Sequence, residues 1–111
     1  GGENIAPREV EEILLGHEAV REVAVVGRPD PIYGEQVVAY VATRGAWSEE
    51  MAQELRRFAA ERLSSYKVPV DFIALEALPR NRTGKIERRL LRAQEQARFA
   101  VHEVEHAAKA S

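Results

Sequence analysis

Residues 23–42 read VAVVGRPDPIYGEQVVAYVA. Two continuous apolar runs, Val23–Val26 and Val37–Ala42, stand on either side of a segment that contains Gly27 and the Pro29–Pro31 cluster. A short apolar run bounded by glycine and proline is typical of a strand that is buried in a sheet. The Pro29–Pro31 cluster predicts a turn. We therefore predict two buried strands separated by a turn.

Helical patterns and a third strand surround these two strands. Residues 7–16 begin with a proline at a first-turn position, repeat apolar residues at helical spacing and end at a glycine. Ser48 is a natural N-cap for a second helix that should stop near Ser64. Val70–Leu75 predicts a third strand, and a long helix should begin at about Glu87. This order predicts a small α+β domain of about three strands with helices packed on the sheet.

The composition limits the class of protein. The chain has 111 residues, enough for one domain, and its 45% hydrophobic and 31% charged residues are typical of a globular protein. It has no cysteine, which excludes disulfides, thiolate metal sites and a cysteine nucleophile. A net charge of −2 argues against nucleic acid or an anionic membrane as a bulk electrostatic partner. We see no membrane span or signal peptide, so we expect a cytoplasmic protein.

A basic stretch near the end of the chain holds the most informative motif. Gly84 allows a tight polar turn over residues 81–84, which would present Lys85 between a strand and a helix. An isolated Gly-Lys pair is more often a solvated turn, and a Walker phosphate loop is excluded because its upstream glycine and following Ser or Thr are missing. The stretch contains only one acid, Glu87, which favours an anion as its ligand. Its cationic residues are Arg80, Arg82, Lys85, Arg88, Arg89 and Arg92.

Four phrases together resemble the C-terminal domain of adenylate-forming ligases, the superfamily of acyl- and aryl-coenzyme A synthetases. Residues 78–89, LPRNRTGKIERR, resemble the C-terminal signature of that superfamily. Residues 1–11, GGENIAPREVE, resemble the segment after its domain hinge. Residues 23–35 resemble the next strand and turn, and residues 66–69, YKVP, resemble the segment before the final strand. The phrases occur in the order of the superfamily, which makes the match specific.

The resemblance implies a two-step reaction. A carboxylic acid attacks the α-phosphorus of ATP to give an acyl-adenylate and pyrophosphate, and a thiol then displaces AMP. It also implies that Lys85 is the catalytic residue of the first step, reaching into a large N-terminal domain. The domain would then rotate, and Gly1 and Gly2 would line the tunnel for the pantetheine thiol.

The resemblance favours coenzyme A as the thiol, because residues 66–69 are closer to coenzyme A ligases than to peptide synthetases. An aryl-acid ligase that loads a carrier protein is the alternative. Some coenzyme A ligases hold the nucleotide end of coenzyme A with basic residues around the proline that matches Pro69, and this chain has Val68 and Val70 there. We therefore expect Lys67, Tyr33 or the basic stretch to contact that nucleotide. Mg²⁺ is expected in the full enzyme, bound by the N-terminal domain.

The resemblance runs from Gly1 to about Arg92, so we expect a domain at residues 1–92 followed by a helical tail at residues 93–111. We expect the chain to be part of a longer ligase whose own N-terminal domain is its partner, and to be inactive alone. The alternative of another class is a non-catalytic module that binds anions or nucleic acid through the basic stretch. The lack of aromatic residues within that stretch counts against single-strand binding.

Two further sequence motifs bear on metal binding and on lysine acetylation. His102–His106 matches H-E-x-x-H, but a zinc protease needs a third ligand and a cleft, so we interpret the match as a solvated helix and expect no metal site. Pro79 and Gly84-Lys85 have the P-x-x-x-x-G-K spacing that resembles the acetylation site of bacterial acyl-coenzyme A synthetases. A protein acetyltransferase that acts on Lys85 is therefore an expected partner.

Overall fold

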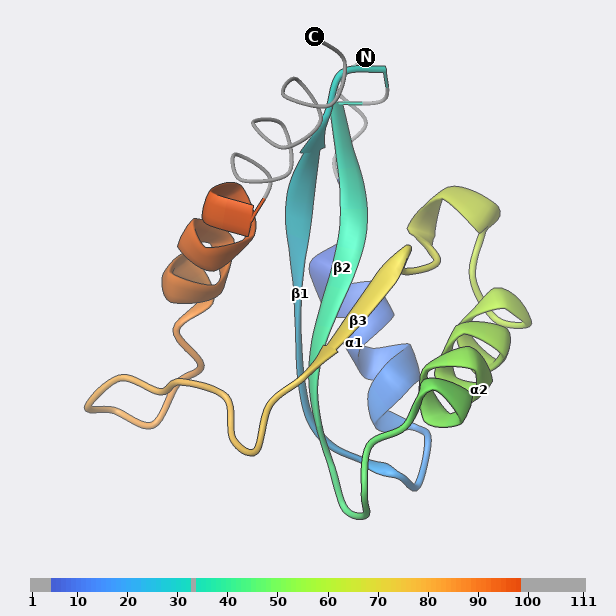
Figure 1. Cartoon of the computed structure of the whole chain (residues 1–111), viewed down its shortest axis with the longest axis horizontal. Coiled ribbons are helices and arrows are strands. Elements are labelled where there is room, and N and C mark those ends of the chain that lie inside the picture. The colour runs from blue at the N-terminus through green and yellow to red at the C-terminus, as the bar shows by residue number, and fades with distance from the viewer. Residues whose placement is uncertain (1–4, 33, 99–111) are drawn as a thin grey trace, which may run out of the picture.

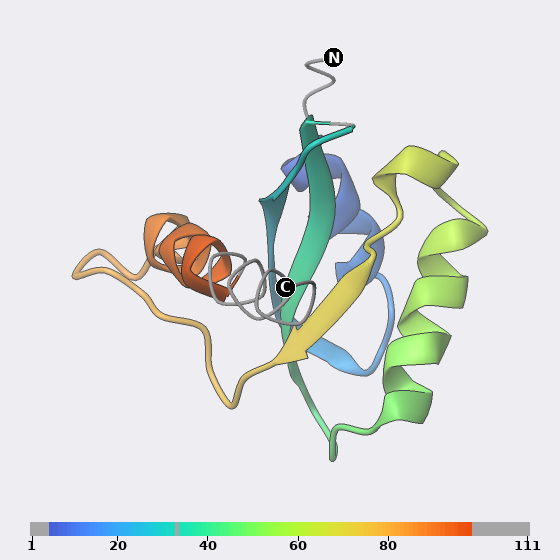
Figure 2. The ribbon, with the colours of Figure 1, turned by 45° about the horizontal axis from the view of Figure 1, so that its top comes forward.

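The chain folds into a three-stranded sheet with helices on both faces (Figures 1 and 2). The computed structural model describes residues 5–32 and 34–98. It confirms the predicted α+β class with three strands. The elements are α1 (Pro7–Leu15), β1 (Val20–Asp30), β2 (Gly34–Thr43), α2 (Glu49–Ala60), the 3₁₀ turn η1 (Ser65–Lys67), β3 (Asp71–Ala74) and a final helix that occupies residues 88–98 of the described part.

The strand order is β1-β2-β3. β1 and β2 pair antiparallel from Val20↔Thr43 to Asp30↔Gly34, and β3 pairs parallel to β2 after the crossover through α2. β1 is longer than the apolar run predicted, because it continues through Gly27 and Pro29. β1 lies at the edge of the sheet, where a proline needs no hydrogen-bond partner on its outer side.

Both faces of the sheet are buried, which explains why the strands read as continuous apolar runs. Alternate side chains of β1 and β2 point to opposite faces. One face packs against α1 and α2 through a large core cluster, and the other packs against the final helix through a smaller one. In β1 and β2 the first face carries Val23, Val25, Val37, Ala39 and Val41, whereas the second carries Ala24, Val26, Val38 and Tyr40.

The helix ends follow the sequence closely. α1 ends at Leu15, with Gly16 as its C-cap, which confirms the glycine as the predicted end of this helix. The Ser48 hydroxyl accepts a hydrogen bond from the Met51 backbone N–H at 3.1 Å, which confirms the predicted N-cap of α2. α2 ends at Ala60, before the predicted Ser64, and a turn places Leu63 on the core. Within residues 5–32 and 34–98, no helix is long and apolar enough to cross a membrane.

Candidate functional site

Residues 80–86 form a short hairpin that projects from the body of the domain beside the final helix (Figure 1). Arg80 and Ile86 pair antiparallel at its base, and the Asn81 N–H donates to the Lys85 carbonyl at 2.8 Å. The Asn81 side-chain oxygen accepts hydrogen bonds from the backbone N–H of Thr83 (2.9 Å) and of Lys85 (3.0 Å), and from the Thr83 hydroxyl (2.7 Å). Gly84 has φ +87°, a conformation that other residues rarely adopt. The predicted glycine-tipped turn is therefore present, with its backbone held at several points.

Lys85 is exposed on this hairpin, and no side chain in the described part of the molecule forms an ion pair with it. Its ammonium group is thus available to an external anion. The base of the hairpin is attached to β1, because the Arg80 guanidinium donates to the Glu22 carboxylate through Nη2 (2.5 Å) and Nε (3.1 Å). The hydrogen bond from Arg80 is the main reason that the pKa of Glu22 lies below its ordinary value of 4.5.

The final helix, which follows the hairpin directly, is joined to the sheet by buried polar groups. Glu95 is fully buried and accepts hydrogen bonds from Arg28 Nε (2.5 Å) and the Tyr40 hydroxyl (2.7 Å). Burial, together with the hydrogen bond to Glu95, raises the pKa of Tyr40 to about 12. Arg88 forms an ion pair with Glu11 of α1, a carboxylate that is itself buried.

These pairings were missed from the sequence. Arg80 and Arg88 belong to the basic stretch that was expected to attract an anion, yet both are paired with acids, Glu22 and Glu11. The acids lie 58 and 77 residues away in the sequence, so no local pattern could have revealed them. Because part of the positive charge is neutralised internally, the stretch is less suited to a nucleic-acid backbone than its composition indicates.

The other predicted site residues are placed as follows. Lys67 lies at the end of η1, where its ammonium donates to Glu9 of α1 at 2.7 Å, and this hydrogen bond raises the pKa of Lys67. A nucleotide phosphate at Lys67 would have to share the ammonium group with Glu9. Gly1, Gly2 and Tyr33 lie outside the described residues, as does the His102–His106 motif.

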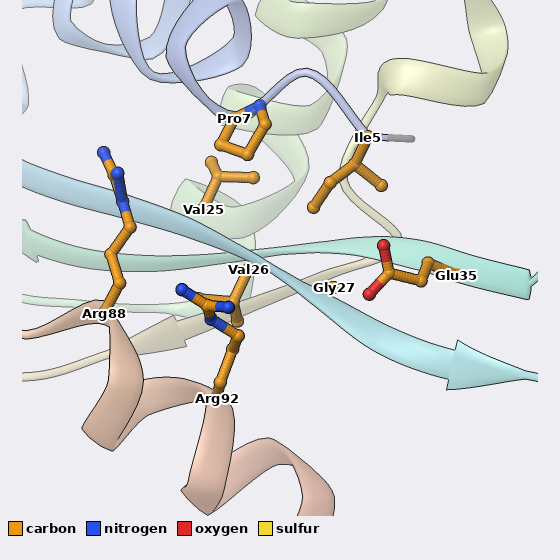
Figure 3. A pocket seen from close by; sticks show the side chains of 8 residues that line it. All are labelled: Ile5, Pro7, Val25, Val26, Gly27, Glu35, Arg88 and Arg92. Atoms are coloured by element: carbon orange, nitrogen blue, oxygen red, sulfur yellow. The ribbon is translucent and has the colours of Figure 1, made fainter. Parts of the chain in front are cut away.

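A pocket of about 300 Å³ opens between the start of α1, β1 and the final helix (Figure 3). Arg88 and Arg92 reach it from successive turns of the helix, and the buried Nε of Arg88 has no hydrogen-bond partner among the described residues. The carboxylate of Glu35 lies over Gly27, where a Cβ atom would come within 2.2 Å of it. The lining mixes charges of both signs with apolar surface. It consists of Ile5, Pro7, Val25, Val26, Gly27, Glu35, Arg88 and Arg92.

The described residues contain no group of three or more histidine, aspartate or glutamate side chains arranged to hold a metal ion. The candidate site centres on the exposed ammonium group of Lys85 on the hairpin of residues 80–86. Such a group can stabilise negative charge, but a reaction centre also needs surfaces that bind the reactants.

Three curated proteins that match this chain are coenzyme A ligases or synthetases. A sulfoacetate–CoA ligase of Cupriavidus necator is 49% identical over 88 residues, which are 79% of this chain and 17% of that protein. A 2-succinylbenzoate–CoA ligase of Bacillus cereus is 48% identical over 92 residues, or 83% of this chain and 18% of that protein. The acetyl-coenzyme A synthetase of Bacillus subtilis is 38% identical over 96 residues, which are 85% of this chain and 17% of that protein. The chain spans less than a fifth of the length of these relatives.

Two solved structures that resemble this chain are also coenzyme A ligases or synthetases. An anthranilate CoA ligase in complex with anthranoyl-AMP superposes with a TM-score of 0.82 at 32% identity, covering 90% of this chain and 20% of that one. A Mycobacterium tuberculosis fatty acyl CoA synthetase superposes with a TM-score of 0.75 at 43% identity, covering 87% of this chain and 19% of that one.

The fold, the lysine hairpin and these similarities define a domain of adenylate-forming ligases. The sequence profile that matches residues 9–85 is that of the AMP-binding enzyme C-terminal domain, and the chain belongs to this family. The resemblance inferred from the four sequence phrases is thereby confirmed.

Proposed function

We propose that this chain is the mobile C-terminal domain of an ATP-dependent acyl-coenzyme A synthetase and that Lys85 is its catalytic residue. The observation that carries the proposal is the hairpin of residues 80–86, which holds the Lys85 backbone by hydrogen bonds and leaves its ammonium group unpaired within the described residues. The names of the similar ligases include sulfoacetate, 2-succinylbenzoate and anthranilate. Because such different acids share one kind of small domain, we expect the acyl group to be bound by the N-terminal domain.

In the first half-reaction, a carboxylate oxygen attacks the α-phosphorus of ATP, the bond from the α-phosphorus to the bridging oxygen breaks, and pyrophosphate leaves. Negative charge develops on the α-phosphate oxygens as the new bond forms. An ammonium group placed beside those oxygens stabilises that charge more in the transition state than in the ground state. Lys85 would supply this group when the hairpin enters the active site of the N-terminal domain, which would also hold Mg²⁺.

In the second half-reaction, the thiol of coenzyme A attacks the carbonyl carbon of the adenylate, and AMP leaves. We propose that a different face of the domain serves this step after a rotation, with Gly1 and Gly2 beside the pantetheine arm and Lys67 and Tyr33 near the nucleotide end. Lys67 is on the surface next to the exposed ring of Tyr66, with its ammonium 5.6 Å from the ring centre. A cation beside an exposed aromatic ring is suited to a nucleotide, which has both phosphates and a base.

The test of the adenylation role is Lys85→Ala in the ligase that contains this domain. Loss of one preorganised charge donor should lower ATP–pyrophosphate exchange by about 10²- to 10³-fold. Thioester formation from presynthesised acyl-adenylate should fall far less. Arg82→Ala is the matched control, because Arg82 is an exposed cation on the same hairpin. Equal losses in both half-reactions would show that the two steps do not use separate faces.

Gly2→Leu should give the opposite pattern. A side chain at this position would narrow the thiol tunnel, so thioester formation from acyl-adenylate should fall while ATP–pyrophosphate exchange stays within about threefold of the wild type. Gly2→Ala is the graded control, with a smaller loss expected. A Gly2→Leu ligase with normal thioester formation would refute the tunnel role.

A further inference from the structure

The final helix places two charged residues and one leucine on the side that faces the sheet. Arg88, Leu91 and Glu95 follow the i, i+3, i+7 spacing that places side chains on one face of a helix. Leu91 is fully buried in the smaller core cluster, and Glu95 is fully buried beside it. A charged residue at a fully buried position is uncommon unless it is paired. Its partners therefore show what the position does.

The partners of Glu95 connect the helix to every strand of the sheet. One carboxylate oxygen accepts from Arg28 of β1 and the other from Tyr40 of β2. Arg28 in turn donates to Asp71 of β3 at 2.8 Å. Because hydrogen bonds are directional, this arrangement sets the rotation of the helix about its own axis, which an apolar side chain of the same size would leave less defined.

A second, partly buried contact lies seven residues earlier, about 10 Å along the helix. Glu11 of α1 forms an ion pair with Arg88 and also accepts a hydrogen bond from the Val25 N–H at 2.8 Å, on the outer edge of β1. The helix is thus fixed at both ends of its described length. Arg88 is three residues from Lys85, and the Glu87 N–H donates to the Pro79 carbonyl at 2.8 Å, which closes the base of the hairpin against the helix start.

We propose that Glu95 is a positioning residue for adenylation. Its hydrogen bonds to Arg28 and Tyr40 fix the final helix and thereby the direction in which the Lys85 side chain projects from the domain. The proposal rests on the proposed function of Lys85. It assigns a role in the reaction to a buried carboxylate that is ten residues from the lysine and touches no substrate. A displacement of about 1 Å at a reacting group can lower a rate by about 10²-fold, so a small rotation of the helix is sufficient.

The test uses Glu95→Gln and the milder Tyr40→Phe in the ligase that contains this domain. Each should lower kcat for ATP–pyrophosphate exchange by about tenfold, with the KM for ATP and thioester formation from acyl-adenylate within about twofold of the wild type. Glu54→Gln is the control, since it alters an exposed contact with His17 (3.0 Å) on the opposite face of the sheet. Equal losses in both half-reactions, or no loss in either variant, would overturn the proposal.

Two measurements distinguish the positioning role of Glu95 from the proposed catalytic role of Lys85. In a Lys85→Ala background, Glu95→Gln should cause no further loss of adenylation, because it acts through the lysine. A further tenfold loss there would refute the positioning role while leaving the role of Lys85 intact. Residual dipolar couplings of the 111-residue chain should show the amides of residues 82–86 reoriented against β1 and β2 in Tyr40→Phe. Unchanged couplings would refute the proposal whatever the activity of Lys85.

Discussion

Asn81 and Gly84 determine how Lys85 is presented. Gly84 has the positive φ that closes the turn, and the glycine was sufficient to predict it. The three hydrogen bonds accepted by the Asn81 side chain were not predicted, since asparagine, aspartate and serine all occur in such turns for similar reasons. The identity of the lysine as a candidate came from the resemblance of the whole phrase. Its chemistry alone would have left it a solvated basic residue.

Lys85 should be acetylated in preference to Lys67. Acetyl transfer requires the neutral amine. The hydrogen bond to Glu9 raises the pKa of Lys67, so its neutral form is less populated than that of a lysine with the ordinary pKa. Acetylation of Lys85 would remove the positive charge that its proposed role in adenylation requires, without affecting the fold. The measurement is mass spectrometry of the chain after incubation with acetyl-coenzyme A and a broad protein acetyltransferase. Acetylation confined to Lys67 or to Lys109, which lies outside the described residues, would contradict this prediction.

Among the elements, the strands and the start of the final helix were predictable, whereas the buried polar contacts of that helix were not. β1 and β2 were recognised because both faces of the sheet are buried, which leaves an unbroken apolar run. The long helix expected from about Glu87 begins at residue 88 and continues through residue 98, but the full burial of Glu95 within it was not predicted. A glutamate is normally exposed, and its partners Arg28 and Tyr40 lie 67 and 55 residues away.

The attachment of the hairpin to β1 should depend on pH. Glu22→Gln should lower the free energy of unfolding at pH 7 by about 1 kcal/mol, a modest value because Arg80 is partly exposed. The pKa of Glu22 is lower in the folded state than its ordinary 4.5, so the stabilisation is present above pH 4.5 and is lost as pH falls through the folded pKa. The difference between variant and wild type should therefore shrink in acid.

Urea unfolding from pH 7 down to about pH 3 measures this difference. Glu61→Gln is the control, because Glu61 pairs with Arg62 on the exposed surface and should contribute little at any pH. A difference between Glu22→Gln and the wild type that stays constant across this range would contradict the assignment of the stabilisation to the ionised carboxylate.

For the molecule as a whole, the smaller core cluster depends on the final helix. A chain that ends at Arg92 should be less stable than one that ends at residue 98 by about 2–4 kcal/mol, because without Glu95 the buried hydroxyl of Tyr40 and the guanidinium of Arg28 lose a partner. Chemical denaturation of the two chains measures this difference. If both chains unfold at the same denaturant concentration, the helix beyond Arg92 does not contribute to the stability of the domain.

The long separations between the final helix and its partners also bear on how the chain folds. The contacts of Glu95 with Arg28 and Tyr40 and of Arg88 with Glu11 close loops of 55 to 77 residues. Such contacts cost more chain entropy than the β1–β2 hairpin, whose strands are neighbours in the sequence. We therefore expect the helix to dock after the β1–β2 hairpin has formed. On the same grounds we expect Lys85 to become ordered late in folding, and under the proposed function a partly folded domain would present no ordered lysine for adenylation.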